Sequence, residues 1–307
     1  MTTGMPIVST LLGVVLIAFV LRDIFHTLFH PSGIGTLSST GARYLWRVLR
    51  QFARHHRQVL PLAGPLALVA IIATWALVLV LGWALIYWPH LTEGFLLATG
   101  LEPDDNDSFL EAFYFSLVTL GTLGHGKITP LTPWLRIVSP LQALVGFALF
   151  TASISWILSV YPVLGRRRQL AREVALLRRG RSAPGLRTVE DAPAALEGTL
   201  LSLAEQVNAI CGDLEQFPIT YYFHLPDEQS ALPVALPDLV ALAREGQHHG
   251  SPAVRLQSTL LLEAIHDLAG HVGETFDRRG ADLGDALAAY AVDHFYLAPE
   301  PAQAASQ

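Results

Sequence analysis

Residues 108–127 read SFLEAFYFSLVTLGTLGHGK, an apolar run that ends in alternate glycines. Ser108 with Glu111 three positions later is a capping box, which predicts a helix over residues 108–121. The uncharged part, residues 112–126, is 15 residues long, whereas a helix needs about 20 apolar residues to cross a bilayer. We therefore expect this stretch to enter the membrane and return on the same side.

The predicted helix is followed by Thr122, Leu123, Gly124, His125 and Gly126. Glycine adopts a positive φ at little steric cost, and alternating backbone handedness points successive carbonyl groups in one direction. A backbone lined with oxygen atoms is tolerated at membrane depth only where it faces water or ions. The partial negative charge at the C-terminal end of the helix also favours a cation there. The loop is therefore a candidate cation site.

Three other segments contain no charged residue and are long enough to span a membrane. They cover residues 1–21, 58–92 and 137–165. The first is not typical of a signal peptide, because it lacks a basic start and no small-residue cleavage site follows. We expect an all-α membrane protein with three spanning helices and one re-entrant loop, embedded in a lipid bilayer.

The composition agrees with this fold class. The chain has 307 residues, of which 51% are hydrophobic and 15% are charged, against about 25% charged in an average soluble domain. The net charge of −6 argues against a nucleic-acid-binding protein, which needs a basic surface. The single Cys211 allows no intrachain disulfide bond. Because the sequence has no phosphate-binding loop and no hydrolase motif, we do not expect an enzyme.

The arginines predict how the spans are oriented. Residues 43–57, between the first two spans, contain five arginines and no acidic residue, and eight more arginines lie within residues 166–187 after the third span. The positive-inside bias places both segments in the cytoplasm. We therefore expect a plasma-membrane protein with its N-terminus outside and its C-terminal domain in the cytoplasm.

The first arginine cluster has helical periodicity, with Leu45, Leu49 and Phe52 on a different face. This pattern predicts an amphipathic helix that lies in the cytoplasmic interface. A voltage-sensing function is the alternative for repeated arginines. Such arginines lie inside a spanning helix, whereas these flank one, so we favour the interfacial helix.

The stretch from residue 112 to 130 resembles the pore loop of the potassium channel superfamily, whose filter reads Thr-Val-Gly-Tyr-Gly-Asp. Thr122, Gly124 and Gly126 match that motif in place, and Thr119 matches a threonine upstream of it. The flanking spans make the match more specific than the Gly-x-Gly pattern alone.

This resemblance covers about residues 60–161 and implies a bacterial two-helix pore domain with an additional N-terminal span. By that resemblance, residues 122–126 form a selectivity filter that replaces the hydration shell of potassium, and Gly146 is the gating hinge of the inner helix. One chain carries one such loop, so a homotetramer is implied. Potassium ions are then the only bound species, with no further cofactor and no catalytic residues.

The implied division of the chain combines these patterns with the resemblance. Its parts are an N-terminal spanning helix (1–30), an interfacial helix (31–59), a pore domain (60–163), a cytoplasmic helical domain (164–298) and a disordered tail (299–307). The pore domain consists of an outer helix (60–89), a pore helix (108–121), a filter (122–126) and an inner helix (134–162).

The sequence departs from the family motif at two positions, His125 in place of tyrosine and Lys127 in place of aspartate. We favour a structural hydrogen bond for His125 over a proton switch. Lys127 lies at the outer mouth, where four copies would repel an entering cation. Three functions follow: a potassium channel, a weakly selective cation channel, and a non-conducting membrane sensor or scaffold.

Asp23, His26 and His30 are spaced three and four positions apart at the inner end of the first span. Such a face offers a carboxylate and two imidazoles to a metal ion, although interfacial anchoring or packing is the more common use. We retain these residues as a possible metal site and favour packing.

The segment after the third span predicts a helical domain. Residues 166–181 are expected to continue as a basic helix at the lipid surface, and a helix is expected after Pro237. An apolar heptad pattern typical of helix pairing includes Leu200, Leu203, Val207, Ile210 and Leu214.

Overall fold

The computed structural model describes residues 4–29, 35–53, 57–97, 108–124, 126–181, 193–276 and 282–296. Among them, three helices are long and apolar enough to cross a membrane, and they cover Pro6–Leu28, Leu60–Gly94 and Pro133–Arg181. The predicted all-α membrane fold is thereby confirmed. The tail at residues 299–307 lies outside the described residues.

The chain forms two compact units. The first consists of Met1–Arg47 and Leu66–Ser159, and the second of Val48–Pro65 and Val160–Gln307. Three helices, α2 (Thr36–Ala53), α3 (Ala63–Tyr87) and α6 (Pro133–Arg181), contribute residues to both units.

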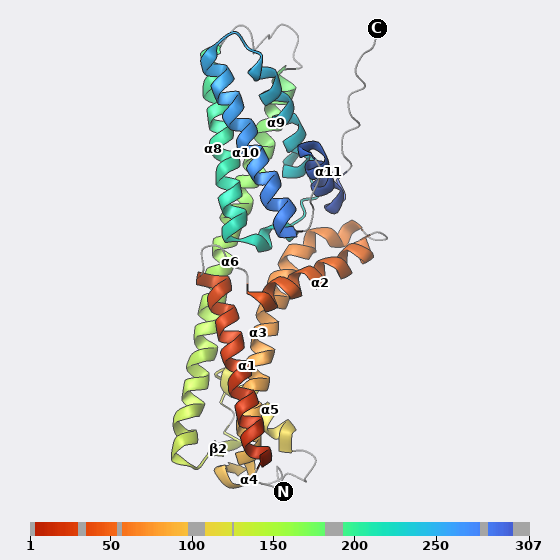
Figure 1. Ribbon diagram of the computed structural model, residues 1–307. Coiled ribbons are helices and arrows are strands. Elements are labelled where there is room, and N and C mark those ends of the chain that lie inside the picture. Colours follow the sequence, from red (N-terminus) through yellow and green to blue (C-terminus); the bar gives the residue numbers. More distant parts are fainter. Residues whose placement is uncertain are drawn as a thin grey trace. The chain divides into compact units, whose positions relative to one another are not determined.

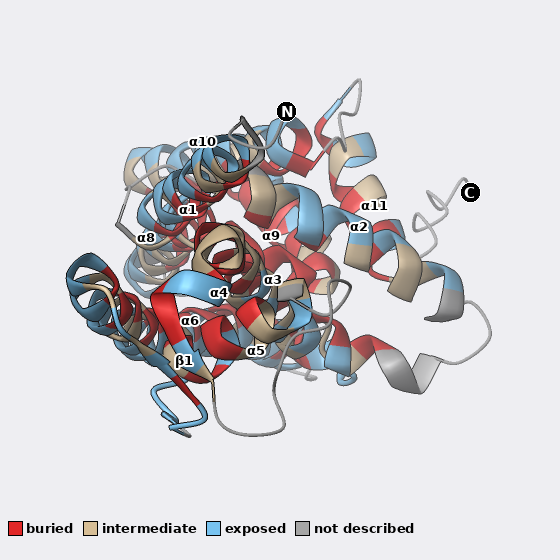
Figure 2. Cartoon of the chain, turned by 90° about the horizontal axis from the view of Figure 1, so that it is seen from below, coloured by how far each residue is buried: buried red, intermediate tan, exposed pale blue. Residues whose placement is uncertain are grey.

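In the first unit, α1 (Gly4–Phe29) lies antiparallel to α3 (Figure 1). Glycines allow the two helices to approach closely, because a Cβ atom on Gly13 would lie 2.4 Å from the carbonyl oxygen of Gly82. Small residues commonly permit such packing between helices in lipid. Figure 2 shows that α1 has one buried and one exposed side, and the exposed side carries apolar residues such as Ile7, Leu11 and Val15. This exposed side is suited to contact with lipid.

A buried carboxylate connects α1, α2 and α3. Asp23 of α1 accepts hydrogen bonds from the backbone amides of Leu37 (2.9 Å) and Ser38 (3.2 Å), which are among the first amides of α2. It also accepts from the Ser38 hydroxyl (2.7 Å) and from the Trp75 indole (2.9 Å). The N-terminal amides of a helix have no partner within the helix, so Asp23 caps α2 from a neighbouring element.

The first unit also contains short elements that the sequence pattern does not predict. They are η2 (Trp88–His90), α4 (Leu91–Gly94), β1 (Phe95–Leu97) and β2 (Ile128–Pro130). The strands are antiparallel, with Leu96 opposite Thr129. The backbone amide of Leu131 also donates to the carbonyl of Gly94 at 2.8 Å. This small sheet fixes the chain on either side of the segment that contains α5 (Ser108–Leu120).

The second unit is a helical bundle. Its elements are the C-terminal part of α6, η1 (Arg57–Leu62), α8 (Pro193–Gln216), η3 (Pro218–Tyr222), η4 (Glu228–Ser230), α9 (Leu232–Gln247), α10 (Pro252–Phe276) and α11 (Leu283–Asp293). The heptad residues Leu200, Leu203, Val207 and Leu214 are fully buried, and α8 packs along α10 within the same chain (Figure 1). The apolar seam therefore forms the core of this unit.

Several arginines of residues 166–181, a segment that the sequence predicts at a lipid surface, pair with helices of the bundle. Arg166 pairs with Asp213 of α8, and Arg178 and Arg181 pair with Asp238 and Glu245 of α9. The sequence pattern cannot distinguish the two cases, because lipid phosphates and protein carboxylates both attract guanidinium groups. The helix continues to Arg181, as the sequence predicts, and contact of its exposed side with lipid stays a prediction.

The helix predicted to follow Pro237 also differs from the prediction. Helix α9 begins at Leu232, and Pro237 lies inside it. Proline has no backbone N–H and therefore removes one hydrogen bond of a helix. At position 237 the missing hydrogen bond would reach only the first turn of α9. The helix therefore continues through Pro237.

Candidate functional site

Helix α5 covers Ser108–Leu120 and so begins where the capping box predicts. The Ser108 side chain lies outside the described part of the structure, and Glu111 Oε2 is buried without a hydrogen-bond partner among the described residues. Ala112, Phe115 and Ser116 are buried against the spanning helices. The helix start is thus established, whereas the capping contact itself stays a prediction.

The C-terminal end of α5 is closed by two overlapping backbone hydrogen bonds. The amide of Leu123 donates to the carbonyl of Val118 at 2.9 Å, and the amide of Thr122 donates to the carbonyl of Thr119 at 3.0 Å. This pair of bonds is a Schellman motif, which requires a left-handed residue just after the helix. That residue is Thr122, with a φ of 57°. Because it is β-branched, a positive φ is strained, and such strain is concentrated at functional sites.

Left-handed backbone recurs at every second residue after α5. Gly124 has a φ of 56° and Gly126 a φ of 68°. Together with Thr122, they place a positive φ at three alternate positions, as the glycine pattern predicts for Gly124 and Gly126. His125 lies outside the described residues. The described residues of this loop, Thr122, Leu123, Gly124 and Gly126, are all exposed in the single chain.

The loop has no side-chain cover in the single chain. A Cβ atom on Gly124 or Gly126 would meet nothing within 4 Å, so these two glycines are needed for their backbone conformation and not for space. Lys127, the only lysine of the sequence, follows immediately and is exposed. From Ile128 the chain enters β2, which anchors the end of the loop to β1.

A buried polar network holds α5 against the spanning helices. Ser116 Oγ donates to the carbonyl of Val80 in α3 at 2.8 Å. Gln142 Nε2 in α6 donates to both the hydroxyl and the carbonyl of Ser116, each at 2.9 Å. The Tyr87 hydroxyl in turn donates to Gln142 Oε1 at 2.9 Å. The network thereby joins α3, α5 and α6.

These network residues are not among those predicted from the sequence, although the sequence contains a signal for them. Gln142 is a polar residue within an apolar span, and such residues almost always face the protein interior or water. Tyr87 and Phe115 add an aromatic contact, with ring centroids 5.0 Å apart. The network supports α5 without exposing polar groups to lipid.

Gly146 lies where α6 meets the end of α5. A Cβ atom at this position would lie 2.0 Å from the carbonyl oxygen of Leu120. Helix α6 continues through Gly146 without interruption. The structure therefore assigns Gly146 a packing contact, and its function as a hinge stays a prediction.

The possible metal site is only partly described. Asp23 uses its carboxylate oxygens to cap α2 and to bind Trp75, and His30 lies outside the described residues. Among the residues that are described, no group of three histidine, cysteine or acidic side chains is placed to hold a metal ion. Asp23 thus has a structural function that sequence spacing did not suggest.

Comparison with known proteins relates the same region to ion channels. A family model described as an ion channel matches residues 73–161, which include α5 and the loop. Over 217 residues the chain is 26% identical to the uncharacterized membrane protein YdjJ of Bacillus subtilis (strain 168), covering 68% of this chain and 61% of that protein. Over 50 residues it is 38% identical to two-pore potassium channel 5 of Arabidopsis thaliana, covering 16% of this chain and 12% of that protein.

Both alignments cover less than two thirds of the relative's own length. No solved structure matches the chain. The predicted resemblance is nevertheless confirmed, since the matched segment carries the helix, loop and second spanning helix on which it was based. Residues 73–161 are related to ion channels.

Proposed function

We propose that the protein is a channel that conducts potassium ions passively through residues 122–126. The alternating positive φ at Thr122, Gly124 and Gly126 carries this proposal. A backbone of this kind presents successive carbonyl oxygens to one side, and such rings of oxygen replace the hydration shell of an ion. Conduction of this type needs no catalytic residue and no cofactor.

Assembly of four chains would complete the site. One chain provides one loop, and its described residues are exposed. Unsatisfied backbone carbonyls at membrane depth are costly, so convergence of four loops around an axis would surround each ion with oxygen atoms. We therefore propose a homotetramer, for which native mass spectrometry should give four copies of the 33.4 kDa chain.

The exposed face of α6 offers a lining for the proposed pore. Thr151, Ser155 and Ser159 are all exposed and follow one another at four-residue intervals, on one side of this face. Thr151 and Ser159 donate to backbone carbonyls of their own helix, at 3.0 and 2.9 Å. Polar side chains in spanning helices face protein or water more often than lipid. This side of α6 therefore suits a water-filled cavity.

We propose that the protein lies in the plasma membrane, with its N-terminus outside the cell and its second unit in the cytoplasm. The arginine-rich residues 43–57 and 166–187 support it through the positive-inside bias. In this orientation the candidate filter and Lys127 lie near the outer surface.

Ion flux into liposomes tests the conduction proposal. We expect potassium-driven flux with the unmodified protein and its loss in Gly124→Ala, because alanine is strained at a φ of 56°. Gly198→Ala is the matched control, since a Cβ atom on Gly198 also meets nothing within 4 Å but no positive φ is involved. Flux that survives in Gly124→Ala would contradict the filter proposal, and absence of flux from the unmodified protein would favour the scaffold.

A weakly selective channel is the second candidate, and the two departures from the family motif favour it. Lys127 is exposed directly after the loop, and His125 replaces the tyrosine of the resembling family. Reversal potentials in potassium against sodium gradients separate the two channel types. A reversal potential near zero in that gradient would identify weak selectivity.

A further inference from the structure

The second unit contains a cavity of about 180 Å³. It is enclosed by η1, the C-terminal part of α6, the segment after η3, and helices α9 and α11. Its volume corresponds to roughly six water molecules of the liquid. This volume suits a small group with a few attached carbon atoms.

The lining of the cavity combines positive charge with hydrogen-bond donors. The lining residues include Arg167, Arg168, His224, His294 and Tyr290. Among the described residues that line the cavity, none carries a carboxylate. A cavity with this lining favours an anion over a cation or a neutral ligand.

Arg167 is the central group of this lining. Only 5% of its surface is exposed. Its Nη1 donates to the carbonyl of Thr220 at 2.7 Å and its Nη2 donates to the Thr220 hydroxyl at 2.9 Å. Its Nε has no hydrogen-bond partner among the described residues. A buried guanidinium with an unused donor is costly unless an anion accompanies it.

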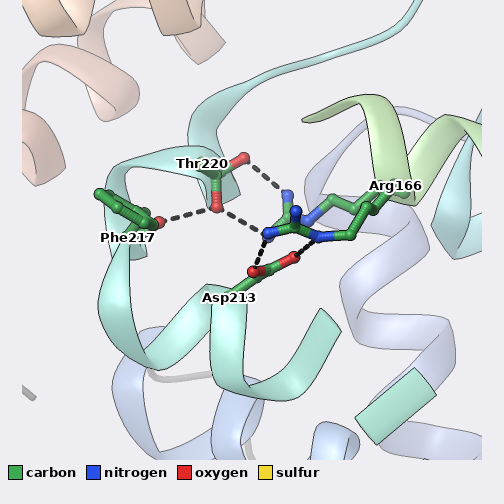
Figure 3. A network of polar contacts seen from close by, with 5 residues as sticks. Arg166, Asp213, Phe217 and Thr220 are labelled. Atoms are coloured by element: carbon green, nitrogen blue, oxygen red, sulfur yellow. Dashed lines mark hydrogen bonds and ion pairs between the residues drawn. The ribbon is translucent and has the colours of Figure 1, made fainter. Parts of the chain in front are cut away.

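The carboxylate whose charge acts on Arg167 is already engaged. Asp213 accepts from Arg166 Nε at 2.7 Å and also from Arg166 Nη2, as Figure 3 shows. Burial lowers the pKa of Arg167, and the electrostatic effects of Tyr290 and Asp213 offset this lowering only in part. The Thr220 hydroxyl donates in turn to the carbonyl of Phe217 at 2.7 Å (Figure 3), which orients it to accept from Arg167.

Aromatic rings and apolar side chains also line the cavity. The rings of His224 and Tyr296 are stacked with centroids 4.9 Å apart. The Tyr296 hydroxyl donates to the carbonyl of Leu225 at 2.7 Å. Pro61 and Leu164 add apolar surface, and this surface accommodates a short carbon body attached to the anion.

We propose that this cavity binds a phosphate group, with Arg167 and Arg168 supplying the opposing charge. Guanidinium groups bind phosphate through paired hydrogen bonds. The phosphate belongs either to a lipid headgroup or to a small soluble phosphate ester. A lipid is a natural source because Pro61 and Leu164 belong to the two apolar segments Leu60–Gly94 and Pro133–Arg181. The proposal does not rest on ion conduction.

Binding to the purified full-length protein in a maltoside detergent tests the proposal. One arm titrates inorganic phosphate and glycerol 3-phosphate, and the other titrates short-chain phosphatidylglycerol, each followed by thermal stability and by phosphorus NMR. Binding of the soluble phosphates identifies a soluble ligand, and binding of the phospholipid alone identifies a headgroup. Binding of neither overturns the proposal.

Two variants connect binding to the cavity. Arg168→Gln removes an exposed charge at the cavity, and Arg167→Lys keeps the buried charge but removes the Nε donor. We expect each to weaken binding by about tenfold or more, as loss of a hydrogen bond to a charged group does. Arg179→Gln is the matched control, because it removes an exposed arginine of the same helix outside the cavity. Equal weakening in Arg168→Gln and Arg179→Gln would show unspecific charge attraction and overturn the site.

Discussion

Close packing alone explains why position 146 is a glycine, and no function as a hinge is needed. Its missing side chain admits the carbonyl of Leu120, which a Cβ atom would approach to 2.0 Å. Because that carbonyl belongs to backbone at the end of α5, it cannot move aside without moving the loop. The close approach places the end of α5 directly on the inner helix.

This close contact leads to a prediction that distinguishes a packing function of Gly146 from a function as a hinge. Gly146→Ala should destabilise the folded protein by about 1–3 kcal/mol, as overpacking usually does, and should lower its thermal unfolding temperature in detergent. Gly165→Ala, in the same helix but with nothing within 4 Å of its Cβ position, should be neutral or slightly stabilising. Equal stability of both variants, with a change only in channel opening, would support the hinge instead.

The residues of the loop show how far sequence reasoning extends at this scale. The glycines at positions 124 and 126 predict left-handed backbone, because glycine alone adopts it without strain, and both have a positive φ. The strained φ of 57° at Thr122 could not be read from residue type, since threonine disfavours it. It results from the Schellman hydrogen bonds that end α5.

At the scale of elements, α5 depends on polar contacts inside an apolar environment. Ser116 is fully buried and its hydroxyl both donates to Val80 and accepts from Gln142. Ser153, also buried, has an Oγ without a hydrogen-bond partner among the described residues. The two serines therefore provide a matched pair.

We expect Ser116→Ala to cost about 1–3 kcal/mol of stability, because it leaves buried groups without a partner. Ser153→Ala should change stability little, since it removes a hydroxyl that makes no bond. Thermal unfolding in detergent measures both, and flux measurements show whether the loop is affected. If the two variants were equally destabilised, the network would not be what holds α5.

Element types could be predicted from the sequence more reliably than element lengths and neighbours. The three spans follow from the absence of charge over stretches long enough to cross a bilayer, and all three are present. Strands β1 and β2 have three residues each, too few for an alternating pattern. The acidic partners of Arg166 and Arg181 lie 47 and 64 positions away, so only the folded bundle reveals that these arginines face protein.

At the scale of the whole molecule, the exposed face of α6 is divided. Ile154 and Leu158 carry apolar side chains on one part of it, whereas Thr151, Ser155 and Ser159 carry hydroxyls on the adjacent part. If lipid surrounded this face of α6 uniformly, hydroxyl and apolar side chains would not be expected to lie on separate parts of it. An assembly with a water-filled centre explains this division, because the hydroxyl side then meets water and the apolar side meets lipid or a neighbouring chain.

Cysteine substitution distinguishes these surroundings in the assembled protein. The native Cys211 is buried and is first replaced by alanine to give a background without thiols. Thiols react as thiolates, which form in water and not in lipid. A water-soluble cationic thiol reagent should therefore modify Ser155→Cys rapidly and suppress ion flux, whereas Ile154→Cys, one position away and also exposed in the single chain, should react slowly and leave flux unchanged. Equal reactivity at both positions would mean that α6 does not line a central cavity, and the proposed arrangement of four chains around the loop would have to be abandoned.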